Sequence, residues 1–180
     1  MNIFLPHERD IKKSVKCLDD LRLNKQALEC HQLLEMALCE KQGKPVGGYK
    51  NHPVYKFYKN NIAFLAYYGF CCCNEMKFRF NKRGSYFKLF YSTLASHGLI
   101  SQDDDDWHIV RIKEPEFEPY YMSGSIDDPN CIRTTEDVSR LFRRKLTQKW
   151  DADKEKGRPP KWTNRKAPSW YYQWEAHNEN

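Results

Sequence analysis

A single carboxylate, Glu29, stands among bases and amides in the stretch LDDLRLNKQALECHQLL. Its polar neighbours at spacings of three and four residues include Arg22, Lys25, Gln26 and Gln32. Such side chains share one face of a helix, and a basic face of this kind suits the phosphates of a nucleic acid. The negative charge of a carboxylate repels phosphate groups. The presence of Glu29 on this basic face therefore calls for a function that compensates for the repulsion.

Glu29 has three interpretations. In the first it pairs with Lys25 one helical turn earlier, an arrangement worth about 0.2–0.5 kcal/mol at most. In the second it is solvated. In the third it is a general acid and base that transfers protons at a sugar within a cationic pocket. The sequence has no second acid at catalytic spacing and no Ser-His or Cys-His arrangement, and His31 is more typical of packing or of the surface than of a ligand site.

One further nucleophile is the α-amino group at the start of the short apolar arm MNIFLP, residues 1–6. Its reference pKa of about 7.7–8.0 leaves a neutral fraction at physiological pH. A neutral amine can attack C1′ of a sugar and form a Schiff base. The apolar residues of the arm are expected to be buried and to hold the terminus in place.

These groups need elements to position them. One helix, or two helices with a break, is expected over residues 8–41, and the loop that contains Gly43, Pro45, Gly47 and Gly48 ends it. A long central helix is expected from about 51 to 80, because apolar residues keep helical spacing throughout.

The start of that central helix has two markers, Asn51 as a possible N-cap and Pro53 near the first turn. A further helix is expected over residues 85–98. A last helix should follow Thr134 or Thr135 and end before a Gly- and Pro-containing break.

Residues 101–131 differ from the rest, with three Pro, little helical period and four consecutive Asp at 103–106. The Asp run is most simply a solvated loop or a helix N-terminus, and a Mg²⁺ site is the alternative. The whole segment is a possible irregular insertion into the domain.

The C-terminal tail carries four of the five Trp at or after position 150, interleaved with cations. Two interpretations stand beside each other. The aromatic rings and cations form a stacking platform with phosphate contacts, or the rings pin the tail to the core.

Composition bounds the class of protein. The chain has 180 residues, of which 40% are hydrophobic and 14% aromatic, so we expect one globular domain spanning residues 1–180. The net charge of +6 is compatible with a polyanionic partner without demanding one.

Seven cysteines, three of them adjacent at 71–73, have neither C-x-x-C nor zinc-ligand spacing. They are interpreted as buried free thiols in a reducing compartment. Without a signal peptide or a long apolar run, the protein is expected inside a cell, in cytoplasm or nucleus, encoded by the cell or by a virus, and not secreted or in a membrane.

Several spaced motifs resemble those of the pyrimidine-dimer DNA glycosylase family, in its longer bacterial and viral branch. They are FLP at 4–6, S..CLDDLRLNKQALE..Q at 14–32, NHP at 51–53, LAYYG at 65–69 and RG at 83–84. The resemblance is good over roughly the first 84 residues, whereas the tail resembles the aromatic-basic C-terminus of the family more loosely.

The resemblance implies an all-α, compact single-domain fold with the N-terminal arm threaded between helices and an aromatic-rich C-terminal segment. It implies a monomeric glycosylase and AP-lyase that needs no metal or cofactor and acts on double-stranded DNA containing damaged bases. The terminal amine would attack C1′ of an ultraviolet-dimerised pyrimidine nucleotide, and β-elimination would cut the strand. Glu29 would be the acid and base.

The resemblance also places the site residues. The expected catalytic set is Glu29, Met1 and Asn2. The Asn at the second position disfavours removal of Met1, so the amine is expected on a retained Met1, and Asn2 carries it only where Met1 is removed. For DNA binding, the resemblance implies Arg22 and Gln32 near the lesion and Trp170, Tyr171 and Tyr172 in the recognition segment. The remaining expected DNA contacts, from the basic helix, the NHP motif and the basic-aromatic tail, are Lys25, Gln26, His52, Lys161, Trp162, Arg165 and Lys166.

Two other functions remain open at this point. The first is a glycosylase for another modified base. The second is a non-catalytic DNA- or RNA-binding protein that relies on the basic-aromatic tail, for which replacing Glu29 by Gln would change nothing measurable.

Overall fold

The structure is a computed structural model, and it describes residues 3–7, 10–101, 111–112 and 135–171. Helices dominate these residues, which confirms the expected all-α class. Several expectations concern positions outside the described residues, namely Met1, Asn2, Tyr172 and most of 101–131 with its Asp run.

Six helices and one short pair of strands make up the described part. They are α1 (Ile11–Cys17), α2 (Asp20–Lys41), α3 (Pro53–Tyr58), α4 (Ile62–Phe80), α5 (Phe87–Ser96), β1 (Ile100–Ser101), β2 (Arg111–Ile112) and α6 (Thr135–Lys154). The two strands pair antiparallel, with Ile100 opposite Ile112.

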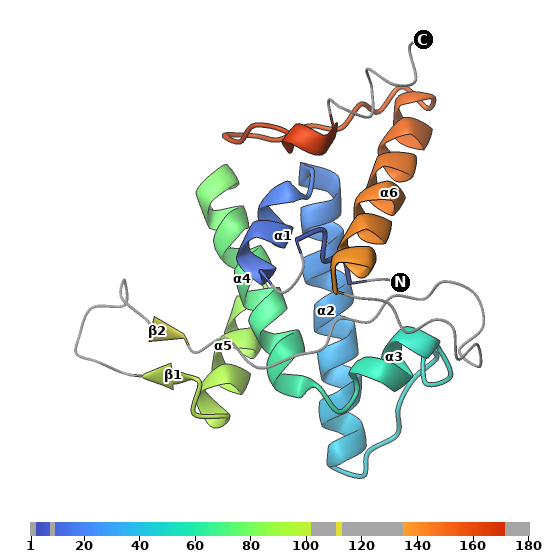
Figure 1. Cartoon of the computed structure of the whole chain (residues 1–180). Helices are drawn as coiled ribbons and strands as arrows, with labels where there is room; N and C mark the ends of the chain where they lie inside the picture. The colour runs from blue at the N-terminus through green and yellow to red at the C-terminus, as the bar shows by residue number, and fades with distance from the viewer. Residues whose placement is uncertain (1–2, 8–9, 102–110, 113–134, 172–180) are drawn as a thin grey trace.

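Helices α2 and α4 form the centre of the fold. α2 packs along α4, and α4 also packs on α1 and α5. α6 lies on the other side of α2 from α5, and the C-terminal tail runs back from α6 over the ends of α1 and α4 (Figure 1). The central pair is therefore covered from both sides, and side chains of α2 reach either neighbour.

Of the two alternatives for residues 8–41, one helix or two helices with a break, the second is confirmed, because α1 and α2 are separate. Asp10 caps α1 by accepting a hydrogen bond from the backbone N–H of Lys13 at 2.8 Å. The backbone is extended at Leu18 and Asp19, so the first helix ends and the second begins there. The turn directs Asp19 toward Trp150 of α6 and Asp20 toward Thr163 of the tail.

The expectation of one long helix over residues 51–80 is wrong, because α3 and α4 are separate. Asn61 is not helical (φ −106°, ψ 49°), and its side-chain amide donates to the carbonyl of Phe57 at 3.1 Å. Asn side chains compete with the helical backbone in this way. The apolar spacing continues across the break, so periodicity alone could not reveal it.

The expected cap of the first of these helices is also displaced by one residue. His52, not Asn51, is the N-cap, and its ring Nδ1 accepts from the backbone N–H of Val54 at 3.2 Å. Pro53 occupies the first helical position, as expected, where a missing N–H costs nothing.

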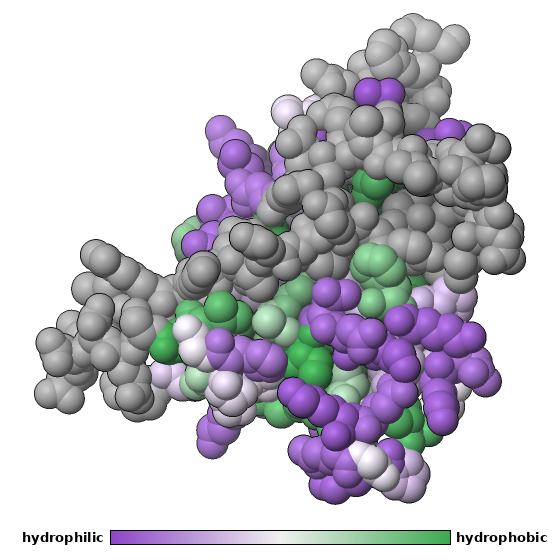
Figure 2. Space-filling view, turned by 60° about the horizontal axis from the view of Figure 1, so that its bottom comes forward, coloured by the Kyte–Doolittle hydropathy of each residue, from purple (hydrophilic) through white to green (hydrophobic). Residues whose placement is uncertain are grey.

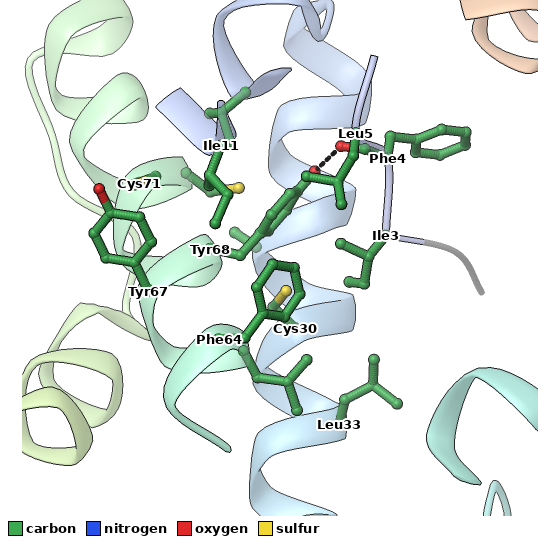
Figure 3. Close-up of a cluster of buried hydrophobic side chains, with 14 of the residues drawn as sticks. Ile3, Phe4, Leu5, Ile11, Cys30, Leu33, Phe64, Tyr67, Tyr68 and Cys71 are labelled. Atoms are coloured by element: carbon green, nitrogen blue, oxygen red, sulfur yellow. Dashed lines mark hydrogen bonds between the residues drawn. The ribbon is translucent and has the colours of Figure 1, made fainter. Parts of the chain in front are cut away.

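The N-terminal arm is threaded between helices, as expected. Ile3, Phe4 and Leu5 are 2%, 4% and 1% exposed. They lie against side chains of α2 and α4 (Figure 3), and the ring of Phe4 meets that of Phe142 on α6 edge-on at 5.9 Å. Burial of each such side chain contributes about 1.5–3 kcal/mol.

The cysteines of the described chain are free thiols, and all but the half-buried Cys39 are buried. Next to them, Gly69 allows a close approach of α4 to α5. A Cβ atom there would lie 2.3 Å from the ring of Phe90. This part of α4 therefore contributes to the packing of the core.

Candidate active site

Gln26 connects the N-terminal arm to Glu29. Its side chain is 1% exposed, and its Oε1 accepts the backbone N–H of Phe4 at 3.0 Å. Its Nε2 donates to Oε2 of Glu29 at 3.0 Å. Because a backbone N–H can only donate, Phe4 fixes the amide with its oxygen toward the arm and its nitrogen toward Glu29.

Tyr68 of α4 supports the same contact. Its hydroxyl lies 2.9 Å from the carbonyl oxygen of Phe4, the bond dashed in Figure 3, and 3.1 Å from Oε1 of Gln26. The hydroxyl has one proton to share between these two acceptors. The arm is thereby held by both central helices at the residue that orients Gln26.

Glu29 is 8% exposed, so the interpretation of a solvated surface acid does not fit. Its Oε1 lies 3.9 Å from Nζ of Lys25, whose side chain is 63% exposed. The expected ion pair is therefore present but loose, and the shorter contact of the carboxylate is with Gln26. The side chain of Lys25 remains accessible to solvent.

Arg22 joins α2 to α6. Its guanidinium pairs with Asp19 at 3.3 Å and with Asp153, and it donates to the carbonyl of Lys149 at 3.1 Å. These contacts account for the burial of its side chain within the protein. Contact of Arg22 with DNA, like that of the buried Gln26, stays a prediction.

Lys149 brings a further cation to this side of the molecule. Burial of the half-buried side chain lowers its pKa, and the positive charges of Lys25, Arg22 and Lys145 act in the same direction, while Glu29 acts against them. α6 therefore places cations close enough to Glu29 to interact with its charge. Sequence analysis missed Lys149, because nothing local indicates which helix faces α2.

His52 lies at the N-terminus of α3. Burial lowers the pKa of its imidazole, and the charge of Glu29 acts in the opposite direction. The Nδ1 atom is occupied as an acceptor by the cap of α3. The loop and α3 thus approach the same carboxylate as α6, and contact of His52 with DNA stays a prediction.

Gln32 follows Glu29 by about one turn and is half-buried. It lines a shallow groove between α2 and the following loop, together with Met36, Val46 and Tyr49. Hydrophilic groups cover this end of the molecule, where α2 ends and the loop to α3 begins (Figure 2). Its expected contact with DNA stays a prediction.

The aromatic residues of the tail pack around Trp150 of α6, which is fully buried. Trp162, Trp170 and Tyr171 have ring centroids 5.2, 5.3 and 5.1 Å from that of Trp150. Trp162 also donates to the carbonyl of Cys17 at 3.0 Å. The rings therefore pin the tail to the core, and their stacking on DNA bases stays a prediction.

Arg165 attaches the tail to α4. Its guanidinium donates to both oxygens of Glu75, at 2.8 and 2.9 Å, and lies 3.8 Å from the ring centre of Phe78. The neighbouring cations Lys161 and Lys166 are exposed. Of the three basic tail residues expected to bind DNA, these two extend into solvent, whereas Arg165 is engaged within the protein.

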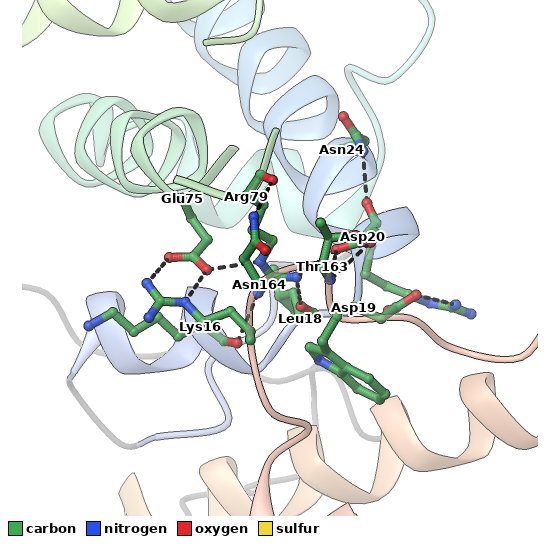
Figure 4. A network of polar contacts seen from close by, with 12 residues as sticks. Lys16, Leu18, Asp19, Asp20, Asn24, Glu75, Arg79, Thr163 and Asn164 are labelled. Carbon is green, nitrogen blue, oxygen red and sulfur yellow. Dashed lines mark hydrogen bonds and ion pairs between the residues drawn. The ribbon is translucent and has the colours of Figure 1, made fainter. Parts of the chain in front are cut away.

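Buried Arg79 completes this polar network (Figure 4). It donates to Glu75 at 2.9 Å and to the carbonyls of Leu18 and Lys16 at 2.7 and 3.0 Å. In the tail, Thr163 donates to Asp20 through both its backbone N–H and its hydroxyl. The start of α2, and with it Arg22 and Glu29, is thus held by contacts from α4 and the tail.

Met1 and Asn2, the expected carriers of the nucleophilic amine, lie outside the described residues. Within the described residues, no three His, Cys, Asp or Glu side chains are grouped so that they could hold a metal ion. The described helices also include none that is long and apolar enough to cross a membrane.

Comparison with known proteins supports the resemblance seen in the sequence. The sequence model of a family described as "Pyrimidine dimer DNA glycosylase" matches residues 1–87. No curated protein and no solved structure matches the chain. The matched part contains the arm, Gln26, Glu29 and Tyr68, whereas α6 and the aromatic tail lie beyond it.

Proposed function

Because the sequence model of the pyrimidine dimer DNA glycosylase family matches residues 1–87, we propose that this protein is a DNA repair glycosylase with AP-lyase activity. The family supports a DNA glycosylase and therefore DNA as the substrate. The proposal goes further in the lesion, an ultraviolet-dimerised pyrimidine, and in the chemistry, a Schiff base on the N-terminal amine with Glu29 as acid and base.

In the proposed reaction the neutral α-amine attacks C1′ of the damaged nucleotide. The C1′–N bond breaks, and the base leaves with the electron pair. The departing base takes a proton from water. The nitrogen, positively charged after its attack, passes a proton to Glu29, and Glu29 donates it to the ring oxygen of the sugar. The ring opens as the nitrogen and C1′ form a protonated Schiff base. Removal of a proton from C2′ then expels the 3′ phosphate by β-elimination, and water releases the amine.

The observation that carries this proposal is the hydrogen-bonded connection from Phe4 through Gln26 to Glu29. Three residues of chain span at most about 11 Å, so an amine at the start of the arm is tethered near the carboxylate. Effective catalysis requires such fixed placement of the nucleophile and the acid. The burial of Ile3, Phe4 and Leu5, which holds the arm between the helices, supports this proposal.

The cations around Glu29 support DNA as the substrate. Lys25 is exposed beside the carboxylate, and Lys149 is half-buried on the facing helix. Their positive charges offset the repulsion between Glu29 and a nearby phosphate. A carboxylate at this position is therefore compatible with DNA binding and is available for proton transfer.

The function is tested by trapping. Incubation of the protein with a dimer-containing duplex and borohydride should reduce the Schiff base to a stable covalent adduct. Mass spectrometry of the N-terminal peptide then identifies the residue that carries the amine, Met1 or Asn2. Absence of both an adduct and strand cleavage on every damaged duplex tried would refute the enzyme.

Glu29→Gln provides the matched test of the acid and base. Cleavage should fall by about 10²–10⁴-fold, the usual contribution of such a group, while DNA binding is kept or tightened because a negative charge is lost. Glu35→Gln, an exposed acid on the same helix, should leave cleavage unchanged. If Glu29→Gln cleaves DNA as fast as the wild type, another residue is the acid and base. Cleavage assays on a panel of damaged duplexes would show whether the protein prefers another damaged base.

A further inference from the structure

A second pocket lies between α1, α4 and α5. Glu29 and the residues that contact it do not line this pocket. Its volume is about 450 Å³. Sites for small ligands typically fall in the range of about 300–1,000 Å³. The pocket therefore has the size of a ligand site, and the chemistry of its walls indicates the ligand.

Aromatic rings form one wall. Phe87 of α5 lies in the middle, with ring centroids 5.4 Å from Phe70 and 6.0 Å from Tyr91. All three residues line the pocket. These tilted rings, with interplanar angles of 33° and 32°, provide an apolar aromatic surface against which a flat heterocycle can pack.

Cations form the rim. The described residues that line the pocket include four cations, Lys12 and Lys16 of α1, Arg83 and Arg165, and one carboxylate, that of Glu75. Glu75 is already engaged, since it accepts hydrogen bonds from Arg165 and from a second arginine. Positive charge therefore exceeds negative charge, and a bound ligand is expected to be an anion.

The cations and rings are arranged together. The guanidinium of Arg83 lies 4.3 Å from the ring centre of Phe87. Lys12 and Lys16 are exposed on the neighbouring helix, one turn apart. A ligand with an aromatic ring attached to a phosphate matches both features at once, because its ring can stack while its charge meets the rim.

We propose that this pocket binds a nucleoside monophosphate group, with the base against Phe87 and the phosphate near Lys16 and Arg83. Two sources have this chemistry, a free mononucleotide and the 5′-phosphorylated end of a DNA strand. The site is separate from Glu29 and the arm, and its occupation needs no lesion.

Calorimetric titration with guanosine monophosphate tests the proposal, with guanosine and inorganic phosphate as partial ligands. The mononucleotide should bind at least ten-fold more tightly than either part. The double variant Lys16→Glu/Arg83→Glu should weaken binding at least ten-fold. Lys88→Glu, on α5 but not lining the pocket, makes a similar charge reversal and should leave binding unchanged.

Phe87→Leu provides a second variant that keeps all charges, and it should weaken the mononucleotide more than phosphate. Competition by 5′-phosphorylated and 5′-hydroxyl oligonucleotides then separates the sources. A strand end is the ligand if only the phosphorylated strand displaces the nucleotide. The proposal is overturned if no saturable binding occurs, or if Lys88→Glu weakens binding as much as the double variant does.

Discussion

At the scale of single residues, the acid among the bases is explained by its neighbours. Glu29 is buried beside an exposed lysine, and its carboxylate is held by Gln26. Gln26 is in turn oriented by the backbone of Phe4. Gln26, which was expected to contact DNA, thus couples the placement of the arm to the orientation of the proposed acid, Glu29.

The first prediction concerns Gln26→Glu. The new side chain keeps an oxygen for the N–H of Phe4, but it sets a second carboxylate beside Glu29. Two such acids in contact cannot both ionise freely, so the pKa of one of them rises. The acid limb of the pH–rate profile for single-turnover cleavage should move to higher pH, and the rate at neutral pH should fall by about ten-fold or more.

Gln32→Glu is the matched control for this prediction, since it adds the same charge about one turn beyond Glu29. It should weaken DNA binding without moving the acid limb. Superimposable pH profiles for the two variants would show that Gln26 does not position Glu29. Thermal unfolding of both proteins distinguishes a loss of function from a loss of fold.

At the scale of elements, the tail is held by a network of charges on α4. Glu75 is 5% exposed at its side chain, and it accepts from Arg79 and Arg165. The side chain of Arg79 is fully buried, and it also donates to two carbonyls at the end of α1. Three parts of the chain therefore depend on one carboxylate.

This network predicts a dependence of stability on pH. Burial acts to raise the pKa of Glu75, but the hydrogen bonds and charges of Arg165 and Arg79 outweigh it and lower the pKa below the ordinary 4.5. A lowered folded-state pKa supplies stability that is present above the unfolded value and lost as pH falls through the folded value. The loss should therefore occur below the ordinary pKa.

Glu75→Gln tests this element. Its free energy of unfolding at neutral pH should be lower than that of the wild type by about 1.5–3 kcal/mol, because the arginines lose a charged partner. Its stability should also fall less steeply as pH decreases below the ordinary pKa of Glu75. Denaturant unfolding across that range measures both, with Glu155→Gln, an exposed acid, expected to follow the wild type. Parallel curves for wild type and Glu75→Gln would contradict the assignment.

At the scale of the whole molecule, the C-terminal half completes a site that begins in the N-terminal half. α6 docks on α2 through Arg22, and the aromatic tail packs around Trp150. Lys161 and Lys166 are left exposed on that tail. The basic character of the chain is thus accessible at its C-terminal end as well as beside Glu29.

DNA binding should accordingly depend on salt through these two lysines. Lys161→Ala and Lys166→Ala should each weaken binding without regard to base sequence, and each should reduce the slope of log K against log salt by about 0.9. Fluorescence anisotropy over a range of salt concentrations measures the slope, with Lys88→Ala on α5 as the control. Slopes that stay at the wild-type value in both tail variants would remove the tail from the DNA interface.

Local patterns in the sequence are sufficient to predict part of this fold. Apolar spacing and turn residues predict the helical class and the buried arm, because these depend on neighbours in sequence. They left open whether residues 8–41 form one helix or two. The family motifs lie within the same N-terminal stretch. The apolar pattern did not predict the separation of α3 from α4, because the hydrogen bond of Asn61 interrupts the helix without interrupting its apolar spacing.

Only the tertiary structure decided the role of the polar residues. A helix presents several polar side chains to its surroundings, and the partner that engages each one comes from a distant part of the chain. Gln26 meets the arm, Arg22 meets α6, and Arg165 meets Glu75. The sequence determined that a carboxylate stands in a basic helix, and packing determined which of its neighbours orient it and which remain exposed to solvent.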